Sequence, residues 1–275
     1  MGEVCEIMQA YGGVSIVNAL PSWYGSSMAI NLKVKVEIRE GKRVYSQESE
    51  LIKTILNYFK EKYSIPDIEV DIESELPQKS GLKSSSAVSV ALIAEIAKQY
   101  DLRNINPPIL SAILSLKAGV SYTGALDDAV ASYCGGIAFT YNKMFRIVKL
   151  ENLEDNLSIL ILAKGGRQKP VNLNELRKYS HVFEEIFKIA LKDYLTAMKM
   201  NGILIANILG YSLEPIEIAL KKGALAAGIS GNGPSYFAVS KNGEEGPIYE
   251  SLKKFGDVII VRPVSLDCKD LSIKD

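Results

Sequence analysis

The chain has 275 residues, enough for one large domain or two smaller ones, with a hydrophobic content of 47% and a charged content of 23% that are ordinary for a globular protein. Lys plus Arg and Asp plus Glu both number 32, and this zero net charge argues against a broad nucleic-acid surface. The sequence has no run of about 20 apolar residues for a membrane span and no basic region of a signal peptide, so we expect a cytoplasmic protein without a nucleic-acid or membrane partner.

The N-terminal half alternates between predicted strands and helices. Apolar and polar residues alternate along the expected strands, whereas apolar residues recur at helical spacing in the expected helices. We predict extended segments at 15–20 and 28–38 with a turn-rich loop at 21–27 between them, a helix at 48–63, a strand at 68–73, helices at 84–100 and 107–119, and strands at 135–141 and 144–150.

The charged stretch 151–156 is the expected domain boundary, which divides the chain into residues 1–153 and 154–275. The second half again mixes strands and helices, so the predicted fold class is α+β. We expect a buried strand at 157–163, helices over most of 181–210 and at 215–223, a strand, a glycine-rich turn and a strand within 224–240, a helix at 247–256, and a last strand at 257–263.

The cysteines Cys5, Cys134 and Cys268 are odd in number and far apart. This spacing favours reduced thiols over a disulfide framework or a zinc site. The single histidine, His181, has no motif around it, and we expect it on the surface of a helix.

The stretch LPQKSGLKSSSAVSV at 76–90 places a glycine turn and serines at the start of a helix. Backbone N–H groups in the first turn of a helix lack partners and carry a partial positive charge, so they bind anions such as phosphate. Lys83 adds a full positive charge there. The simpler alternative is that Ser84 is an N-cap and Gly81 an ordinary turn residue.

Two later stretches also contain residues that suit a catalytic or ligand-binding site. Asp127 and Asp128 follow a glycine turn in TGALDDA, where a carboxylate could accept a hydroxyl proton or hold magnesium, although an acid at this position also suits a helix start. The segment GISGNGPS at 228–235 predicts a glycine-rich concavity between two strands, or a simple hairpin loop.

Taken in order, the three stretches resemble the motifs of the GHMP kinases, and the forms GLKSSSA and TGALDDAVASYCGGI resemble the archaeal shikimate kinases among them. The resemblance implies an N-terminal α/β nucleotide-binding domain and a C-terminal ferredoxin-like domain. It also implies the cofactors ATP and Mg²⁺, and phosphorylation of the 3-hydroxyl of shikimate. The sequence leaves a monomer and a homodimer equally open, since the apolar helices of the C-terminal half could support a dimer as easily as a core.

The resemblance assigns roles to particular residues. Asp127 aligns best with the family's catalytic aspartate, Asp128 is its competitor, and Ser85 matches the magnesium ligand. The expected nucleotide-binding residues are Pro77, Lys79, Ser80, Gly81, Leu82, Lys83, Ser84, Ser85, Ser86 and Ala87. For the substrate we expect Gly231, Asn232 and Gly233, with Arg167 and Lys164 as candidates for its carboxylate, although 163–169 also reads as a solvated basic turn.

The sequence departs from the family in two places. Residues 10–32 contain no lysine, whereas many members place one near the catalytic aspartate, and Lys83 is a possible replacement. The segment 115–120 contains no acid where several members have a second metal ligand, so Asp128 or water is the candidate for that ligand. The alternatives are another GHMP kinase such as homoserine kinase, and a non-catalytic regulator with the same fold.

Overall fold

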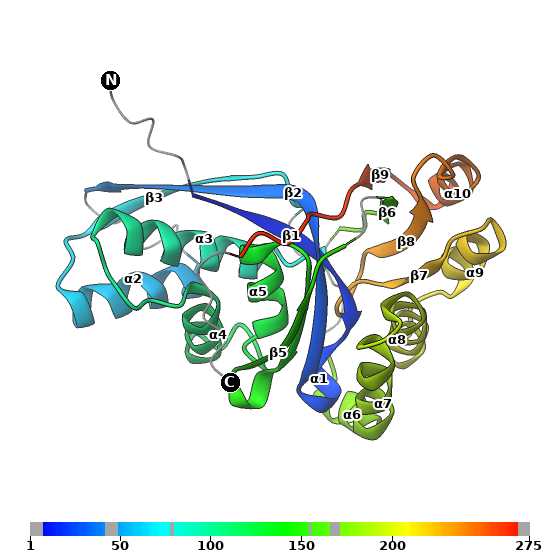
Figure 1. Cartoon of the computed structure of the whole chain (residues 1–275), viewed down its shortest axis with the longest axis horizontal. Coiled ribbons are helices and arrows are strands. Elements are labelled where there is room, and N and C mark those ends of the chain that lie inside the picture. Colours follow the sequence, from blue (N-terminus) through cyan, green and yellow to red (C-terminus); the bar gives the residue numbers. More distant parts are fainter. Residues whose placement is uncertain (1–7, 42–48, 78–79, 154–155, 166–170, 269–275) are drawn as a thin grey trace.

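The computed structural model describes residues 8–41, 49–77, 80–153, 156–165 and 171–268, and it contains two antiparallel sheets (Figure 1). The first sheet has the order β1 (Met8–Val17), β2 (Tyr24–Glu40), β4 (Ile137–Tyr141) and β5 (Arg146–Glu151), and β3 (Ile68–Ser74) pairs with the far part of β2. The second sheet has the order β7 (Ala226–Ile229), β8 (Tyr236–Lys241), β6 (Leu157–Leu162) and β9 (Val258–Val261).

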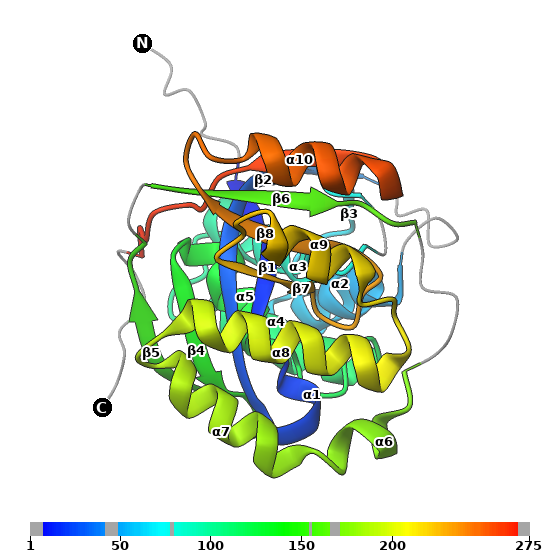
Figure 2. The same cartoon turned by 90° about the vertical axis from the view of Figure 1, so that its right-hand side faces the viewer.

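The helices fall into two groups at opposite ends of the molecule in Figure 1, and in Figure 2 the second group lies nearest the viewer. The first group is α2 (Glu50–Tyr63), α3 (Ser84–Gln99), α4 (Pro107–Lys117) and α5 (Leu126–Cys134). The second group is α7 (Ser180–Ala190), α8 (Tyr194–Leu209), α9 (Glu214–Lys221) and α10 (Gly246–Leu252). The short helices α1 (Ala19–Ser22) and α6 (Leu173–Arg177) contact each other.

Burial follows the apolar pattern of the sequence. All six residues of β6 are buried, as expected for a strand without polar alternation. Helix α3 buries residues over most of its circumference and contacts β1, β2, α4 and α5, so it is the central helix of the first half. Helix α8 contacts both β7 and β1 and thereby joins the two sheets. Helices α3 and α8 therefore support the loops from which the candidate active site is built.

Most predicted elements are confirmed, but several differ. The segment 15–20 is extended only up to Val17, because β1 covers Met8–Val17 and α1 begins at Ala19, and α6 was not predicted. Residues 21–27 are not one loop, because α1 ends at Ser22 and β2 begins at Tyr24. The segment 126–134, read only as acids before small residues, is helix α5. The helical region 181–210 is two helices, and Asp193 caps the second by accepting a hydrogen bond from the Thr196 amide. His181 is exposed on α7, as expected.

The expectation of reduced thiols is wrong for two of the cysteines. Cys134, at the end of α5, forms a disulfide with Cys268, 134 positions later. The chain after β9 returns to the first sheet, where the Asp267 amide donates to the Cys134 carbonyl. Counting cysteines could not reveal this return path. Cys5 lies outside the described residues.

The expected boundary at 153/154 lies between β5 and β6, which belong to different sheets. The position of this boundary stays a prediction. The end of the chain crosses back over it, since Pro263 bridges to Ile30 and residues 264–268 lie against the first half. In the described residues, no helix is long and apolar enough to cross a membrane.

Candidate active site

Helix α3 begins without a side-chain cap. Its N-cap is Lys83, which has a left-handed backbone (φ 69°) and whose side chain makes no capping hydrogen bond. Ser84 is therefore the first helical residue, and its interpretation as the N-cap is wrong. Ser85 is exposed in the same turn. The first amides of a 16-residue helix thus face a cavity rather than a capping oxygen, which suits an anion.

The glycine loop after β7 packs directly on the loop before α3. The Ser230 hydroxyl donates to the Gly81 carbonyl at 2.9 Å, and the Ser235 amide donates to the Ser80 carbonyl at 3.2 Å. A Cβ at Gly81 would lie 2.6 Å from the Ser230 carbonyl oxygen, and Gly81 also has a positive φ of 84°. Only glycine fits here, and the structure joins two motifs that are distant in sequence.

Asp127 is buried in the first turn of α5 and points toward β2. Its Oδ1 accepts from the side-chain nitrogen of Asn142 at 2.9 Å, and its Oδ2 contacts the Ser27 hydroxyl at 3.1 Å. Burial and the neighbouring Asp128 carboxylate raise the pKa of Asp127 to about 7, against the opposing effects of Lys83, Asn142 and Ser27.

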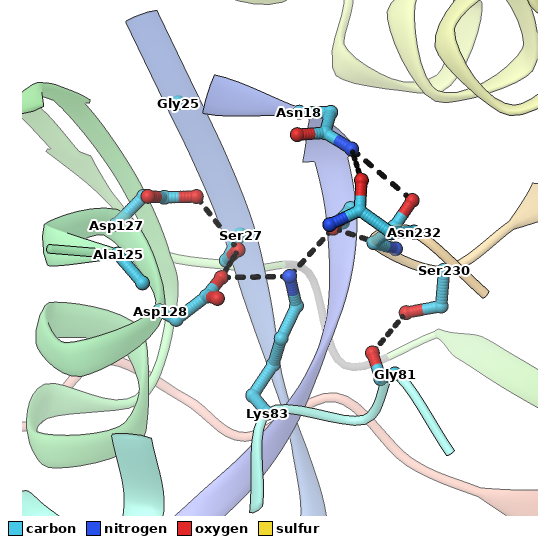
Figure 3. A network of polar contacts seen from close by, with 12 residues as sticks. Asn18, Gly25, Ser27, Gly81, Lys83, Ala125, Asp127, Asp128, Ser230 and Asn232 are labelled. Atoms are coloured by element: carbon cyan, nitrogen blue, oxygen red, sulfur yellow. Dashed lines mark hydrogen bonds and ion pairs between the residues drawn. The ribbon is translucent and has the colours of Figure 1, made fainter. Parts of the chain in front are cut away.

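Asp128 faces the loop before α3. Its Oδ1 lies 2.5 Å from the Ser27 hydroxyl and 2.8 Å from the Lys83 ammonium, as Figure 3 shows. Lys83 also donates to the Ser15 hydroxyl at 2.6 Å, and Ser15 accepts from the Gly231 amide at 3.0 Å. One polar network therefore connects both aspartates to both glycine-containing loops.

Two asparagines fix the other side of the network. Asn18 donates through its side-chain nitrogen to the Asn232 side-chain oxygen at 2.7 Å and to the Gly231 carbonyl at 3.2 Å. The backbone N–H of Asn18 donates to the side-chain oxygen of Asn201 on α8 at 2.8 Å. Because the Asn232 oxygen is occupied by Asn18, the Asn232 side-chain nitrogen is the end left to donate.

Two cavities meet at this network. The smaller, of about 180 Å³, contains both aspartates, and the larger, of about 670 Å³, follows the start of α3. Residues lining both are Lys83, Val120, Ser121, Ala125, Asp128, Gly231 and Asn232. Residues lining only the smaller one are Ser15, Asn18, Ala19, Leu20, Tyr122, Thr123, Asp127 and Val171. The Lys83–Asp128 ion pair thus stands where two ligands would meet.

Most of the predicted site residues come together here. Those lining the larger cavity are Ser80, Gly81, Leu82, Lys83, Ser84, Ser85 and Ser86. Gly233 lines neither cavity and instead packs against the Tyr211 ring. The Lys164 ammonium donates a hydrogen bond to the Phe255 carbonyl. Pro77 accepts from the Ser80 hydroxyl through its carbonyl, and the Ala87 amide bonds to the Lys83 carbonyl, so both support the loop. Lys79 and Arg167 lie outside the described residues.

Sequence reasoning missed the roles of Ser15, Ser27 and Asn142. Each is a single polar residue in or beside a strand, and a motif search gives no signal for such positions. The described residues contain no group of three or more His, Cys, Asp and Glu that could hold a metal ion. Ser85, the predicted magnesium ligand, and Asp128 both line the larger cavity.

Comparison with known proteins identifies the family. The model of the GHMP kinases N terminal domain matches residues 50–136, and that of the GHMP kinases C terminal matches residues 214–258. The chain is 37% identical to shikimate kinase of Methanocella arvoryzae (86% of this chain, 85% of the relative). It is 34% identical to that of Archaeoglobus fulgidus (96% and 95%). The chain belongs to the GHMP kinase family.

Solved GHMP kinase structures share the whole fold. Mevalonate kinase of Methanococcus jannaschii superposes with a TM-score of 0.74 at 15% identity, over 95% of this chain and all of that one. Galactokinase of Lactococcus lactis superposes with a TM-score of 0.69 at 14% identity, over 98% and 97%. The predicted α+β fold of a two-domain GHMP kinase is confirmed, and GHMP kinases use ATP.

Proposed function

We propose that this GHMP kinase transfers the γ-phosphoryl group of ATP to the 3-hydroxyl of shikimate, giving shikimate 3-phosphate and ADP. The names of the curated relatives, which match over most of both chains, support the substrate. The observation that carries the chemistry is the position of the Lys83–Asp128 pair between the two cavities. In-line phosphoryl transfer needs charge stabilisation and a proton acceptor at such a junction.

The larger cavity suits the nucleotide phosphates. The uncapped amides of α3 and the Lys83 ammonium supply positive charge along one wall. Ser85 is exposed in the first turn, where its hydroxyl could ligate Mg²⁺. Magnesium would neutralise phosphate charge during transfer. Lys83 pairs with Asp128 and could serve in place of the N-terminal lysine that many family members carry.

The smaller cavity suits a compact polyol. Hydroxyl and amide groups line it from Ser15, Asn18, Ser121, Thr123 and Asn232, and such neutral groups match the hydroxyls of shikimate. The aspartate pair lies at its inner wall, where it would orient the attacking hydroxyl and take its proton. Arg167 remains our candidate partner for the substrate carboxylate, and Arg167→Ala should then raise the KM for shikimate with little change in kcat.

The proposal is tested by following ADP release with Mg-ATP and, separately, shikimate, homoserine or mevalonate. Turnover with shikimate alone is expected. Turnover with homoserine or mevalonate alone would agree with the proposed phosphate-binding site but would contradict shikimate as the substrate. ATP binding without turnover in any mixture would overturn the enzymatic proposal and favour a regulator.

A further inference from the structure

Ser27 contacts both aspartates with a hydroxyl that has one hydrogen. Its Oγ lies 2.5 Å from Asp128 Oδ1 and 3.1 Å from Asp127 Oδ2, and Ser27 is fully buried. A hydroxyl can donate that hydrogen to only one carboxylate. The contact with Asp128 is the shorter one, and the Lys83 ammonium lies 2.8 Å from the same Asp128 oxygen, which favours an ionised Asp128 that accepts the Ser27 hydrogen.

The remaining contact, between Ser27 and Asp127, is then favourable only if Asp127 brings a hydrogen of its own. The other Asp127 oxygen already accepts from Asn142. In this structure the Asn142 side-chain oxygen accepts from the Thr140 hydroxyl at 2.6 Å, which leaves the Asn142 side-chain nitrogen to donate to Asp127. With Oδ1 accepting from Asn142, Oδ2 is the oxygen left to carry a hydrogen toward Ser27.

We propose that Ser27 joins the two aspartates into one acid pair that carries a single proton on Asp127, so that Asp128 is the ionised member that takes the proton of the acceptor hydroxyl. Ser27 is then a positioning residue and Asp128 the catalytic base. This inference rests on the proposed kinase function and decides between two carboxylates that sequence alignment leaves open.

Burial and charge agree with this assignment. Asp127 is 3% exposed, and the Asp128 side chain is 15% exposed and lines both cavities. Lys83 pairs with Asp128 and provides the counter-charge for its ionised form. The remaining partners of Asp127 are neutral: Gly25 and Ser27 from β2, and Asn142 after β4. Burial without a direct cation favours the protonated form, and the pKa of Asp127 is raised accordingly.

The chemical step balances with Asp128 as base. Ser27 and Lys83 both contact Oδ1 of Asp128. As the acceptor oxygen bonds to the γ-phosphorus, its O–H proton moves to Asp128 and the bond from phosphorus to the β-phosphate oxygen breaks to release ADP. Asp128 returns the proton to solvent after product leaves. Asp127 keeps its proton throughout and adds no second negative charge beside the transferring group.

Asp127→Asn and Asp128→Asn separate the two roles. An amide at position 127 would reproduce the protonated acid, because its oxygen could accept from Asn142 and its nitrogen donate to Ser27. We expect Asp127→Asn to lower kcat by about 10-fold or less, and Asp128→Asn to lower it by about 10²–10⁴-fold, the usual contribution of a general base. Equal losses, or a larger loss in Asp127→Asn, would overturn the proposal.

Ser27→Ala tests the link itself, with Ser26→Ala as its matched control. Ser26 is the neighbouring buried serine of β2, and in the described structure its hydroxyl has no hydrogen-bond partner. Ser27→Ala should lower kcat about 10-fold or more while the KM for ATP stays within about 2-fold, and should shift the alkaline limb of the kcat profile. Ser26→Ala should change neither. Identical behaviour of the two variants would contradict the link.

The proton can also be observed without turnover. Infrared difference spectra between about pH 5.5 and pH 8.5 should show a protonated-carboxyl band in the wild type that is absent in Asp127→Asn and retained in Ser26→Ala. A band that survives Asp127→Asn and disappears in Asp128→Asn would overturn the assignment. If the band is present but shikimate is not phosphorylated, the proposed substrate is contradicted while the proposed proton on Asp127 is supported.

Discussion

Gly25 and Asp127 touch across the interface between β2 and α5. A Cβ at Gly25 would lie 2.5 Å from Cγ of Asp127, so the buried carboxyl group rests directly on the backbone of the strand. This close approach holds Asp127 in reach of Ser27 and Asn142. The catalytic geometry thus depends on a residue with no side chain.

Gly25→Ala should push Asp127 out of place. Overpacking is expected to lower the free energy of unfolding by about 1–3 kcal/mol, and displacement near the reacting groups should lower kcat by roughly 10²-fold. Denaturant unfolding and ADP release measure the two effects. Gly246→Ala is the matched control, because a Cβ there meets nothing within 4 Å, and it should change neither quantity.

Lys83→Met removes the ammonium between the two cavities. The variant leaves Asp128 without its counter-charge, so kcat should fall by about 10²-fold or more while the fold is retained. Lys117→Met, on the exposed face of α4, should leave kcat unchanged. Near-normal kcat in Lys83→Met would show that the cation is not needed for transfer.

Gly81→Ala tests the contact between the two loops. Gly119 is its control, because it also has a positive φ, of 68°, but a Cβ there meets nothing within 4 Å. Both substitutions should cost about 1 kcal/mol of stability through backbone strain. Only Gly81→Ala should weaken ATP binding, by about 10-fold or more, since its Cβ would force the Ser230 loop away. Calorimetric titration with ATP gives the answer, and equal affinities would refute the role of the contact.

The raised pKa of Asp127 predicts how stability depends on pH. The pKa is about 7 in the folded state against an ordinary value of 3.8, so between these values the folded state binds more protons than the unfolded state. The free energy of unfolding should therefore fall as pH rises from about 4 to about 7, by on the order of a few kcal/mol. Asp127→Asn should flatten this fall in urea titrations. An unchanged slope would assign it to other groups.

Cys268→Ser tests the disulfide. Its loop spans 134 positions, and losing it should lower the free energy of unfolding by about 2–5 kcal/mol. The wild type in reductant and the variant without reductant should unfold at the same denaturant concentration. If reductant leaves the wild type unchanged, the two cysteines are not joined in solution.

The sequence predicted those parts of the candidate site whose residues are neighbours along the chain. The start of α3 and the loop 228–235 were found because glycines and serines cluster there, and the two aspartates because they are adjacent. Local patterns cannot show partners brought together by strand pairing. Ser27 reaches the aspartates because β2 lies beside α5, and Cys134 meets Cys268 because the chain returns after β9. The same limit made Ser84 look like an N-cap, since nothing local shows that Lys83 adopts a left-handed backbone.

Phosphoryl transfer to the 3-hydroxyl of shikimate can be tested on the product itself. The most direct measurement is a nuclear magnetic resonance analysis of the product formed from Mg-ATP and shikimate, which locates the phosphate by its coupling to ring protons. We expect one monoester, with phosphorus coupled to the proton on C3. A phosphate on another carbon, or no ester from shikimate while another alcohol is phosphorylated, would contradict it.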